Sequence, residues 1–167
     1  MNPTLCYGPF TPHFSLPTSD LGAISRNLFV YNLLFPGTFP SLTPYIDVRD
    51  VARAHLRALH SPLTSQVGRK RILLSSSYGQ PLQKRLELIA NQRFALKERL
   101  ITATPQMTEA LDVLPINFKR VEEVLGMKTV NFHSVEETIL DTVDALIEVE
   151  AQWRSAGHPI VTPTPGF

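Results

Sequence analysis

The clearest pattern of hydrophobic and polar positions lies between residues 45 and 59, where a short strand is followed directly by a helix. Tyr45, Ile46 and Val48 are residue types that suit a pleated strand. Asp50 is a typical N-cap residue, and the residues that recur at helical spacing after it are Val51, Ala52, His55, Leu56 and Leu59. The pattern therefore predicts a strand–helix unit whose helix starts at Asp50.

Four other segments have apolar residues at helical spacing. They cover residues 21–34, 80–100, 117–125 and 134–153. Thr18-Ser19-Asp20 can cap the first of these helices. The third ends before Gly126, a typical C′ residue, and the last starts at a capping box formed by Ser134 and Glu137.

Two further segments are predicted to be extended. They are residues 3–7 and Arg71–Ser75, and the continuous apolar centre of the second is typical of a parallel sheet. The sequence therefore predicts an α/β fold in which Leu5–Tyr7 and Arg71–Ser75 are parallel neighbours in an incomplete sheet. We expect residues 1–155 to form one domain and the proline-rich residues 156–167 to be a disordered tail.

Composition narrows the class of protein only a little. The 167 residues suffice for one domain with a core, and 43% hydrophobic residues is ordinary for a globular protein. A net charge of +1 gives no reason to expect nucleic acid as a partner, and a single cysteine excludes an internal disulfide. No segment has the roughly 20 apolar residues of a membrane helix, and no signal peptide is visible. We expect a cytoplasmic protein.

The usual patterns of metal and nucleophile sites are missing from the sequence. His55 and His60 are five residues apart and not the three or four that share a helix face. Ser75, Ser76 and Ser77 follow a predicted strand but lack a G-x-S-x-G turn. The sequence therefore predicts no metal ligands and no catalytic residues.

Several segments, taken in order, resemble the extended short-chain dehydrogenase/reductase family. Residues 45–59 are similar to its V-D-V-R-D-V-A-x-A-H segment, and residues 2–10 to the N-P-x-x-V-x-G-P segment that follows the catalytic Tyr-Lys pair. Residues 69–76, 117–127 and 134–146 resemble its later motifs. The similarity is to dihydroflavonol and cinnamoyl-CoA reductases and fungal ketone or aldehyde reductases. It implies the incomplete C-terminal part of a Rossmann-type doubly wound sheet with a mostly helical substrate-binding subdomain.

The family's nucleotide-binding and catalytic motifs cannot be found in the 167 residues. The eight glycines lie too far apart for a G-x-x-G-x-x-G turn against a pyrophosphate. The four tyrosines are followed four residues later by Thr11, Phe35, Arg49 and Leu82, and never by lysine. The resemblance thus implies the C-terminal half of an NADP-dependent reductase, and we expect this half alone to bind no cofactor.

The resemblance also assigns candidate site residues. Pro3 and Thr4 correspond to positions beside the nicotinamide, although Pro3 can equally be a residue that starts a strand. Phe10, Pro44 and Tyr45 correspond to positions that face the substrate, although both aromatic residues are also ordinary core residues. Asp47, Arg49 and Asp50 are expected to provide an N-cap and an ion pair.

Three hypotheses on function follow. The chain is half of a reductase for ketones or aldehydes of secondary-metabolite type, or a non-catalytic binding protein derived from that half, or an enzyme that reuses the old substrate pocket without a nicotinamide. Whether the chain is itself an enzyme stays open. An incomplete sheet leaves an uncovered edge and a partly uncovered face at Ile72–Leu74. We therefore expect self-association, or a complementary chain that covers the sheet.

Overall fold

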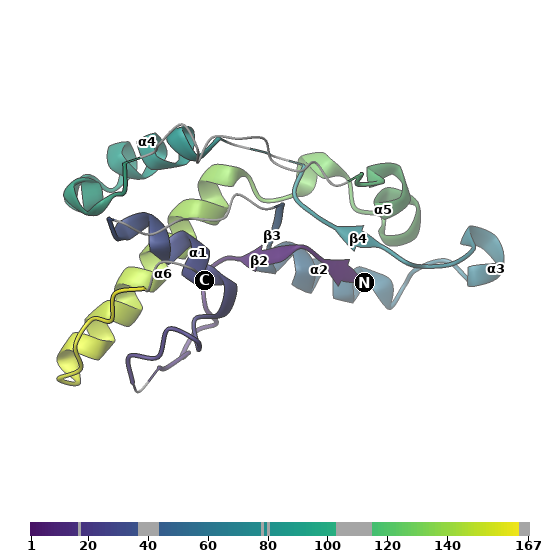
Figure 1. The fold of residues 1–167 in the computed structure, drawn as a ribbon. Coiled ribbons are helices and arrows are strands. Elements are labelled where there is room, and N and C mark those ends of the chain that lie inside the picture. The colour runs from purple at the N-terminus through teal and green to yellow at the C-terminus, as the bar shows by residue number, and fades with distance from the viewer. Residues whose placement is uncertain (17, 37–43, 78, 80, 103–114, 164–167) are drawn as a thin grey trace.

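The structure, a computed structural model, is α/β and describes residues 1–16, 18–36, 44–77, 79, 81–102 and 115–163. Short strands pair in parallel, and helices lie around them (Figure 1). The strands of this described part are β1 (Asn2–Pro3), β2 (Leu5–Tyr7), β3 (Tyr45–Asp47) and β4 (Leu73–Leu74). Its α-helices are α1 (Leu28–Tyr31), α2 (Val48–Ala58), α3 (Thr64–Val67), α4 (Leu82–Gln92), α5 (Phe118–Leu125) and α6 (Val135–Ser155). Its 3₁₀ helices are η1 (Ser25–Asn27), η2 (Asn32–Leu34), η3 (Phe94–Arg99) and η5 (Thr129–Asn131).

Residues 2–7 pair with two different strands in succession. β1 lies parallel to β4, with Pro3 opposite Leu74, and β2 lies parallel to β3, with Leu5 opposite Tyr45. The parallel arrangement was predicted, but the neighbours were not: Leu5–Tyr7 lies beside β3 and not beside residues 71–75. Both β3 and β4 are only two or three residues long, so their sequences do not specify which part of residues 2–7 each one joins.

The helix after β3 starts earlier than its sequence predicts. Asp47 has an extended backbone, and its carboxylate accepts the backbone N–H of Arg49 at 2.8 Å, so Asp47 and not Asp50 is the N-cap of α2. Val48, expected in the strand, is the first helical residue. Asp50 instead accepts hydrogen bonds from the backbone N–H of His133 at 2.9 Å and from Arg53 at 2.8 Å. Distant contacts therefore decide which of two suitable aspartates caps the helix.

The predicted ends of the two C-terminal helices are confirmed. Ser134 and Glu137 form a complete capping box at α6. Asn117 caps α5 through the N–H of Arg120, and Gly126 follows that helix in the left-handed conformation, at φ +63°. These ends depend on residues within one turn of the chain, and for that reason the sequence is sufficient to place them.

Two predicted long helices are interrupted. Residues 21–34 form turns, η1, α1 and η2 in place of one helix, and the Asp20 carboxylate accepts the N–H of Gly22 in a local turn. Residues 80–100 divide at Arg93, whose backbone is not helical and whose guanidinium binds Asp144 of α6. A segment with helical periodicity throughout is therefore broken at a residue that contacts α6.

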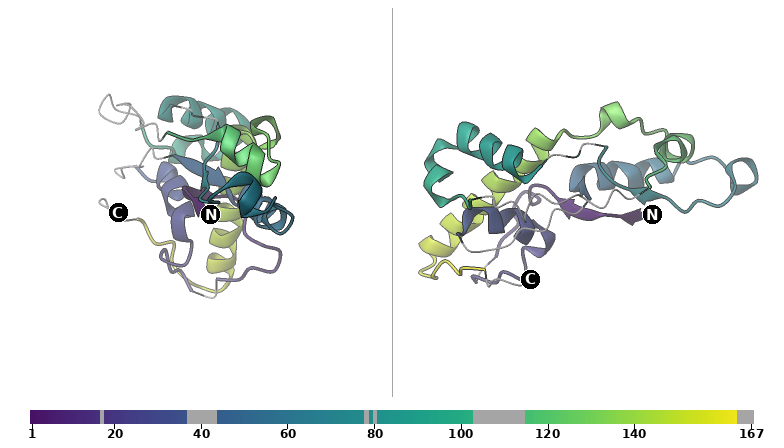
Figure 2. Two further views of the ribbon diagram at one scale, coloured as in Figure 1. Left: turned by 90° about the vertical axis from the view of Figure 1, so that its right-hand side faces the viewer. Right: turned by 45° about the horizontal axis from the view of Figure 1, so that its top comes forward.

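The buried residues form two clusters. One joins α1, α4 and α6, and the other joins β3, β4, α2 and α5. In Figure 2 the helices of the first cluster lie towards one end of the elongated ribbon, and α2 and α5 of the second cluster lie towards the other. Ile72 and Leu74 are almost fully buried in the second cluster, against Val121 and Val124 of α5 among others. The prediction that residues 72–74 leave an uncovered face is therefore wrong for these two residues.

The chain turns back after α6. The backbone N–H of His158 donates to the carbonyl of Trp153 at 2.9 Å, and Ile160 packs against the first cluster. Among the helices of the described residues, none is both long enough and apolar enough to cross a membrane.

Candidate functional site

The two positions predicted to lie near a cofactor are at the end of β1. Pro3 is exposed, and its missing N–H suits a position where no strand partner needs a donor. Thr4 donates both its backbone N–H and its hydroxyl to the carbonyl of Leu74, at 2.9 and 3.2 Å. The Thr4 side chain therefore helps to hold β4 in place.

Tyr45 and Pro44 lie at the start of β3. Tyr45 is only 2% exposed and stacks on Tyr7, with ring centroids 5.5 Å apart. The guanidinium of Arg85, on α4, lies 5.3 Å from the centre of the Tyr45 ring. The carbonyl of Pro44 accepts the N–H of Leu5 at 3.3 Å and so joins β3 to β2.

Burial is the main influence on the ionisation of the Tyr45 hydroxyl. It raises the pKa of Tyr45 above that of a free tyrosine, an effect that the neighbouring Ser76 and the charge of Arg85 only partly offset. Burial also lowers the pKa of Arg85, which is itself almost fully inside the protein. Sequence reasoning missed Arg85 because a single arginine on a helix normally faces solvent.

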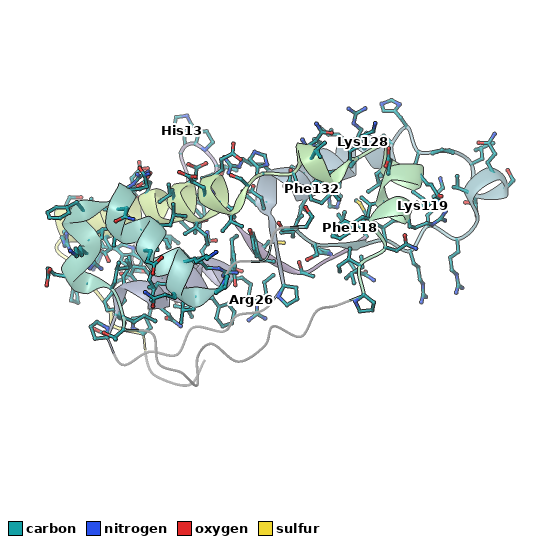
Figure 3. All side chains as sticks on the ribbon, turned by 90° about the horizontal axis from the view of Figure 1, so that it is seen from above. His13, Arg26, Phe118, Lys119, Lys128 and Phe132 are labelled. Carbon is teal, nitrogen blue, oxygen red and sulfur yellow. The ribbon has the colours of Figure 1, made fainter. Side chains whose placement is uncertain are left out.

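Phe10 lies at a cavity. It stacks on Phe14, with ring centroids 4.4 Å apart, and both line a cavity of about 600 Å³. Residues 9–14 form one wall and α6 the other, and His13, labelled in Figure 3, belongs to the first wall. A volume of this size is typical of sites for small organic molecules. The lining residues contributed by α6 are Asp141, Asp144, Ala145, Glu148, Val149 and Gln152.

The turn that carries Phe10 is fixed by a reciprocal pair of hydrogen bonds. The buried Asn27 side chain donates to the carbonyl of Gly8 at 2.8 Å and accepts the N–H of Gly8 at 3.2 Å. Gly8 has φ +143°, and a Cβ there would lie 2.6 Å from Cγ1 of Val48. Only glycine fits between this turn and α2. Asn27 was not predicted, since nothing in its own segment indicates a partner 19 residues away.

Two of the carboxylates in the cavity wall are paired with arginines. Asp141 accepts from Arg49 at 2.6 Å, and Arg49 also binds Asp47. Asp144 accepts two hydrogen bonds from Arg93, at 2.5 and 2.6 Å. These ion pairs tie two carboxylates of the α6 wall to arginines of other segments.

The three substrate-side positions are therefore not gathered in one place. Phe10 lines the cavity beside α6, whereas Tyr45 lies in the core and Pro44 in the strand pair. Within the part of the chain that the structure describes, no group of three or more His, Cys, Asp or Glu side chains could hold a metal ion.

The short parallel strands, the strand–helix unit at residues 45–58 and the surrounding helices define an α/β fold. Solved structures share this fold. Gre2 of Candida albicans in complex with NADPH matches with a TM-score of 0.60 and 23% identity, over 89% of this chain and 43% of that one. Yeast methylglyoxal/isovaleraldehyde reductase Gre2, complexed with NADPH, matches with a TM-score of 0.57 and 25% identity, over 90% of this chain and 46% of that one.

These comparisons confirm the predicted fold class and the predicted likeness to nicotinamide-dependent reductases, since the structural neighbours are Gre2-type NADPH-dependent reductases. The chain spans less than half the length of the solved structures it matches. No model of a known protein family matches the sequence. No curated protein matches it either.

Proposed function

We propose that this chain is the substrate-side half of an NADP-dependent reductase of the extended short-chain type, which reduces ketones or aldehydes. The observation that carries the proposal is the fold match, which covers about nine tenths of this chain but under half of each reductase. The sequence motifs give independent support. The N-P segment forms β1 and β2, which pair with β4 and β3 respectively.

In this proposal Pro3 and Thr4 lie against the nicotinamide through their backbone. The Thr4 hydroxyl is already bonded to Leu74, so the segment contributes shape and carbonyl groups and no side-chain donor. Phe10, Pro44 and Tyr45 lie on the substrate side. Phe10 offers an aromatic surface to a carbonyl compound, and Tyr45 supports the strand that presents Pro44.

The hydride donor and the proton donor come from residues outside this sequence. Carbonyl reduction needs a nicotinamide held beside the substrate and an acid next to the carbonyl oxygen. Tyr45 does not suit the second role, because burial raises the pKa of its hydroxyl and so makes it a weaker acid. Arg49, four residues later, binds Asp47 and Asp141 and is not arranged to activate a phenol.

Reduction is therefore proposed to require a dinucleotide-binding half, supplied in the same polypeptide or as a complementary chain. We propose that the substrates are of secondary-metabolite type and that the protein works in the cytoplasm. A second candidate function is ligand binding without catalysis. It is favoured by one observation: the cavity beside α6 is built entirely from residues of this chain.

NADPH titration tests the proposal. The purified chain should show no saturable binding in the low micromolar range, by calorimetry or nicotinamide fluorescence. A fusion that places the uncovered segment of yeast Gre2 ahead of Met1 should bind NADPH and oxidise it with an aldehyde. Tight NADPH binding by the chain alone would contradict the proposal. A fusion that folds but binds no NADPH would contradict it too, and would favour the non-catalytic alternative.

A further inference from the structure

The outward face of α2 carries apolar side chains that the fold does not use. Leu56 is 66% exposed and Leu59 is 77% exposed. Val48 and Ala52 are also exposed, and spacings of three and four residues place all four on one side of the helix. We refer to Val48, Ala52, Leu56 and Leu59 as the α2 stripe. It extends over the whole length of α2.

The opposite side of α2 is already fully occupied. Ala54 and Asp50 are buried, and the helix packs against β2, β3 and α5. Within the α2 stripe, Val48 packs against the turn at Gly8, whereas Leu56 and Leu59 belong to neither buried cluster of this chain. Single exposed leucines are common on protein surfaces, but an aligned row over three turns is typical of a helix that has a second packing partner.

The charges around the α2 stripe restrict the kind of partner. The acidic residues of this segment, Asp47 and Asp50, are buried and bound to arginines. The exposed charged group beside the two leucines is the cationic Arg57. A complementary surface would therefore be apolar at its centre and acidic at its rim.

The place of α2 in the fold indicates what that partner is. α2 contacts β2, and Figure 2 shows it alongside the strand segment that begins near the N-terminus. The solved reductases have more than half of their length beyond the part that this chain matches. In doubly wound folds, neighbouring helices pack side by side on a face of the sheet.

We infer that the α2 stripe is the docking surface for the dinucleotide-binding half, and that an amphipathic helix of that half with an acidic rim packs against it. The inference rests on the proposed function and adds the surface through which the two halves join. It differs from the earlier expectation of an uncovered sheet, because it places the main apolar contact on a helix.

Cysteine accessibility tests the inference. In a Cys6→Ser background, Leu59→Cys reports on the α2 stripe, and Phe94→Cys is the matched control because Phe94 is 78% exposed on η3, an element outside α2. Maleimide labelling rates are measured in the chain alone and in the Gre2 fusion. Leu59→Cys should label at least tenfold more slowly in the fusion, while the rate of Phe94→Cys should stay the same.

Labelling and NADPH binding together separate the possible failures. A fusion that binds NADPH while Leu59→Cys labels at its original rate overturns the docking inference and leaves the proposed function intact. Protection without NADPH binding supports the docking inference and counts against the proposed function. If Leu59→Cys is not protected in the fusion and the fusion binds no NADPH, both the docking inference and the proposed function are overturned. Protection that grows with concentration in the chain alone identifies a second copy as the occupant, and so overturns the inference.

Discussion

Replacing Glu150 by glutamine should destabilise the chain more than any comparable change on the surface of α6. The Glu150 carboxylate is buried in the middle of several elements. It accepts the Tyr31 hydroxyl at 2.7 Å, two hydrogen bonds from Arg99 at 2.6 and 3.0 Å, and one from Arg154 at 3.2 Å. One charge therefore joins α1, η3 and α6.

The size of the effect follows from these contacts. Removing one partner of a buried ion pair costs about 3–5 kcal/mol, because the other charge is left without compensation. Glutamine keeps part of the hydrogen bonding, and the Arg99 side chain is 29% exposed, so solvent reduces the loss. We expect a decrease of about 3 kcal/mol in the free energy of unfolding, at the low end of that range. For a chain of this size, that corresponds to a Tm lower by roughly 6–12 °C.

The effect should depend on pH in a defined direction. Burial alone would raise the pKa of Glu150, but the hydrogen bonds from Arg99 and Tyr31 and the nearby positive charges lower it below the usual value. A carboxyl group with a lowered pKa in the folded state stabilises the fold above its unfolded pKa, about 4.3. That stability is lost as the pH falls below this value, so the difference between the wild type and Glu150→Gln should shrink on acidification.

Urea unfolding followed by circular dichroism measures both quantities, at pH 7 and at pH 4 and below. Glu148→Gln is the matched control, since Glu148 lies on the same helix and is exposed, and it should change stability by less than about 0.5 kcal/mol. If Glu150→Gln costs no more than this control, or if its effect grows as the pH falls, the Glu150 network does not stabilise the chain as described.

Three further predictions concern single residues and the cofactor. Gly8→Ala should lower the free energy of unfolding by about 1–3 kcal/mol, because the added Cβ would lie 2.6 Å from Val48. The control is Gly68→Ala, at φ +68° with open space around it, which measures the backbone strain alone. An equal loss of stability in both variants would contradict the role of the contact with Val48. Ser134→Ala should cost about 1 kcal/mol in urea unfolding by removing the cap that bonds Glu137, and no measurable loss would show that the capping box adds nothing. NADPH fluorescence should show no saturable binding to the chain alone, and a Kd in the low micromolar range would contradict the proposed division of the site.

The sequence could predict the bounds of α5 and the start of α6, but not the other helix boundaries or the partners of the strands. Ser134 with Glu137 and Gly126 act within one turn, so their effect is the same in any fold that keeps the helix. The choice between Asp47 and Asp50 as N-cap was wrong, because His133, 83 residues away, supplies the backbone N–H that engages Asp50. The break between α4 and η3 falls at Arg93, which binds Asp144 of a distant helix.

The candidate site shows the same limit. The motifs of residues 2–10 and 45–59 predicted the reductase-type fold, which the comparisons confirm, and they selected Phe10 as a substrate-side residue. They could not show that Phe10 would share a cavity with α6, because the walls meet only when residues 9–14 pack against a helix more than 120 residues later. Tyr45 was selected by the same motif, yet it lies in the core, where Tyr7 and Arg85 cover its ring.

The sequence by itself determined the class of fold and the caps of α5 and α6, because these caps depend on neighbouring residues and on local backbone preferences. The tertiary structure alone decided which strand pairs with which, that Glu150 would be buried among two arginines and a tyrosine, and that the leucines of α2 would face outward. These features depend on packing between segments that are distant in the chain. Hydrophobicity and spacing show that such segments must be buried, but they do not specify against which partner.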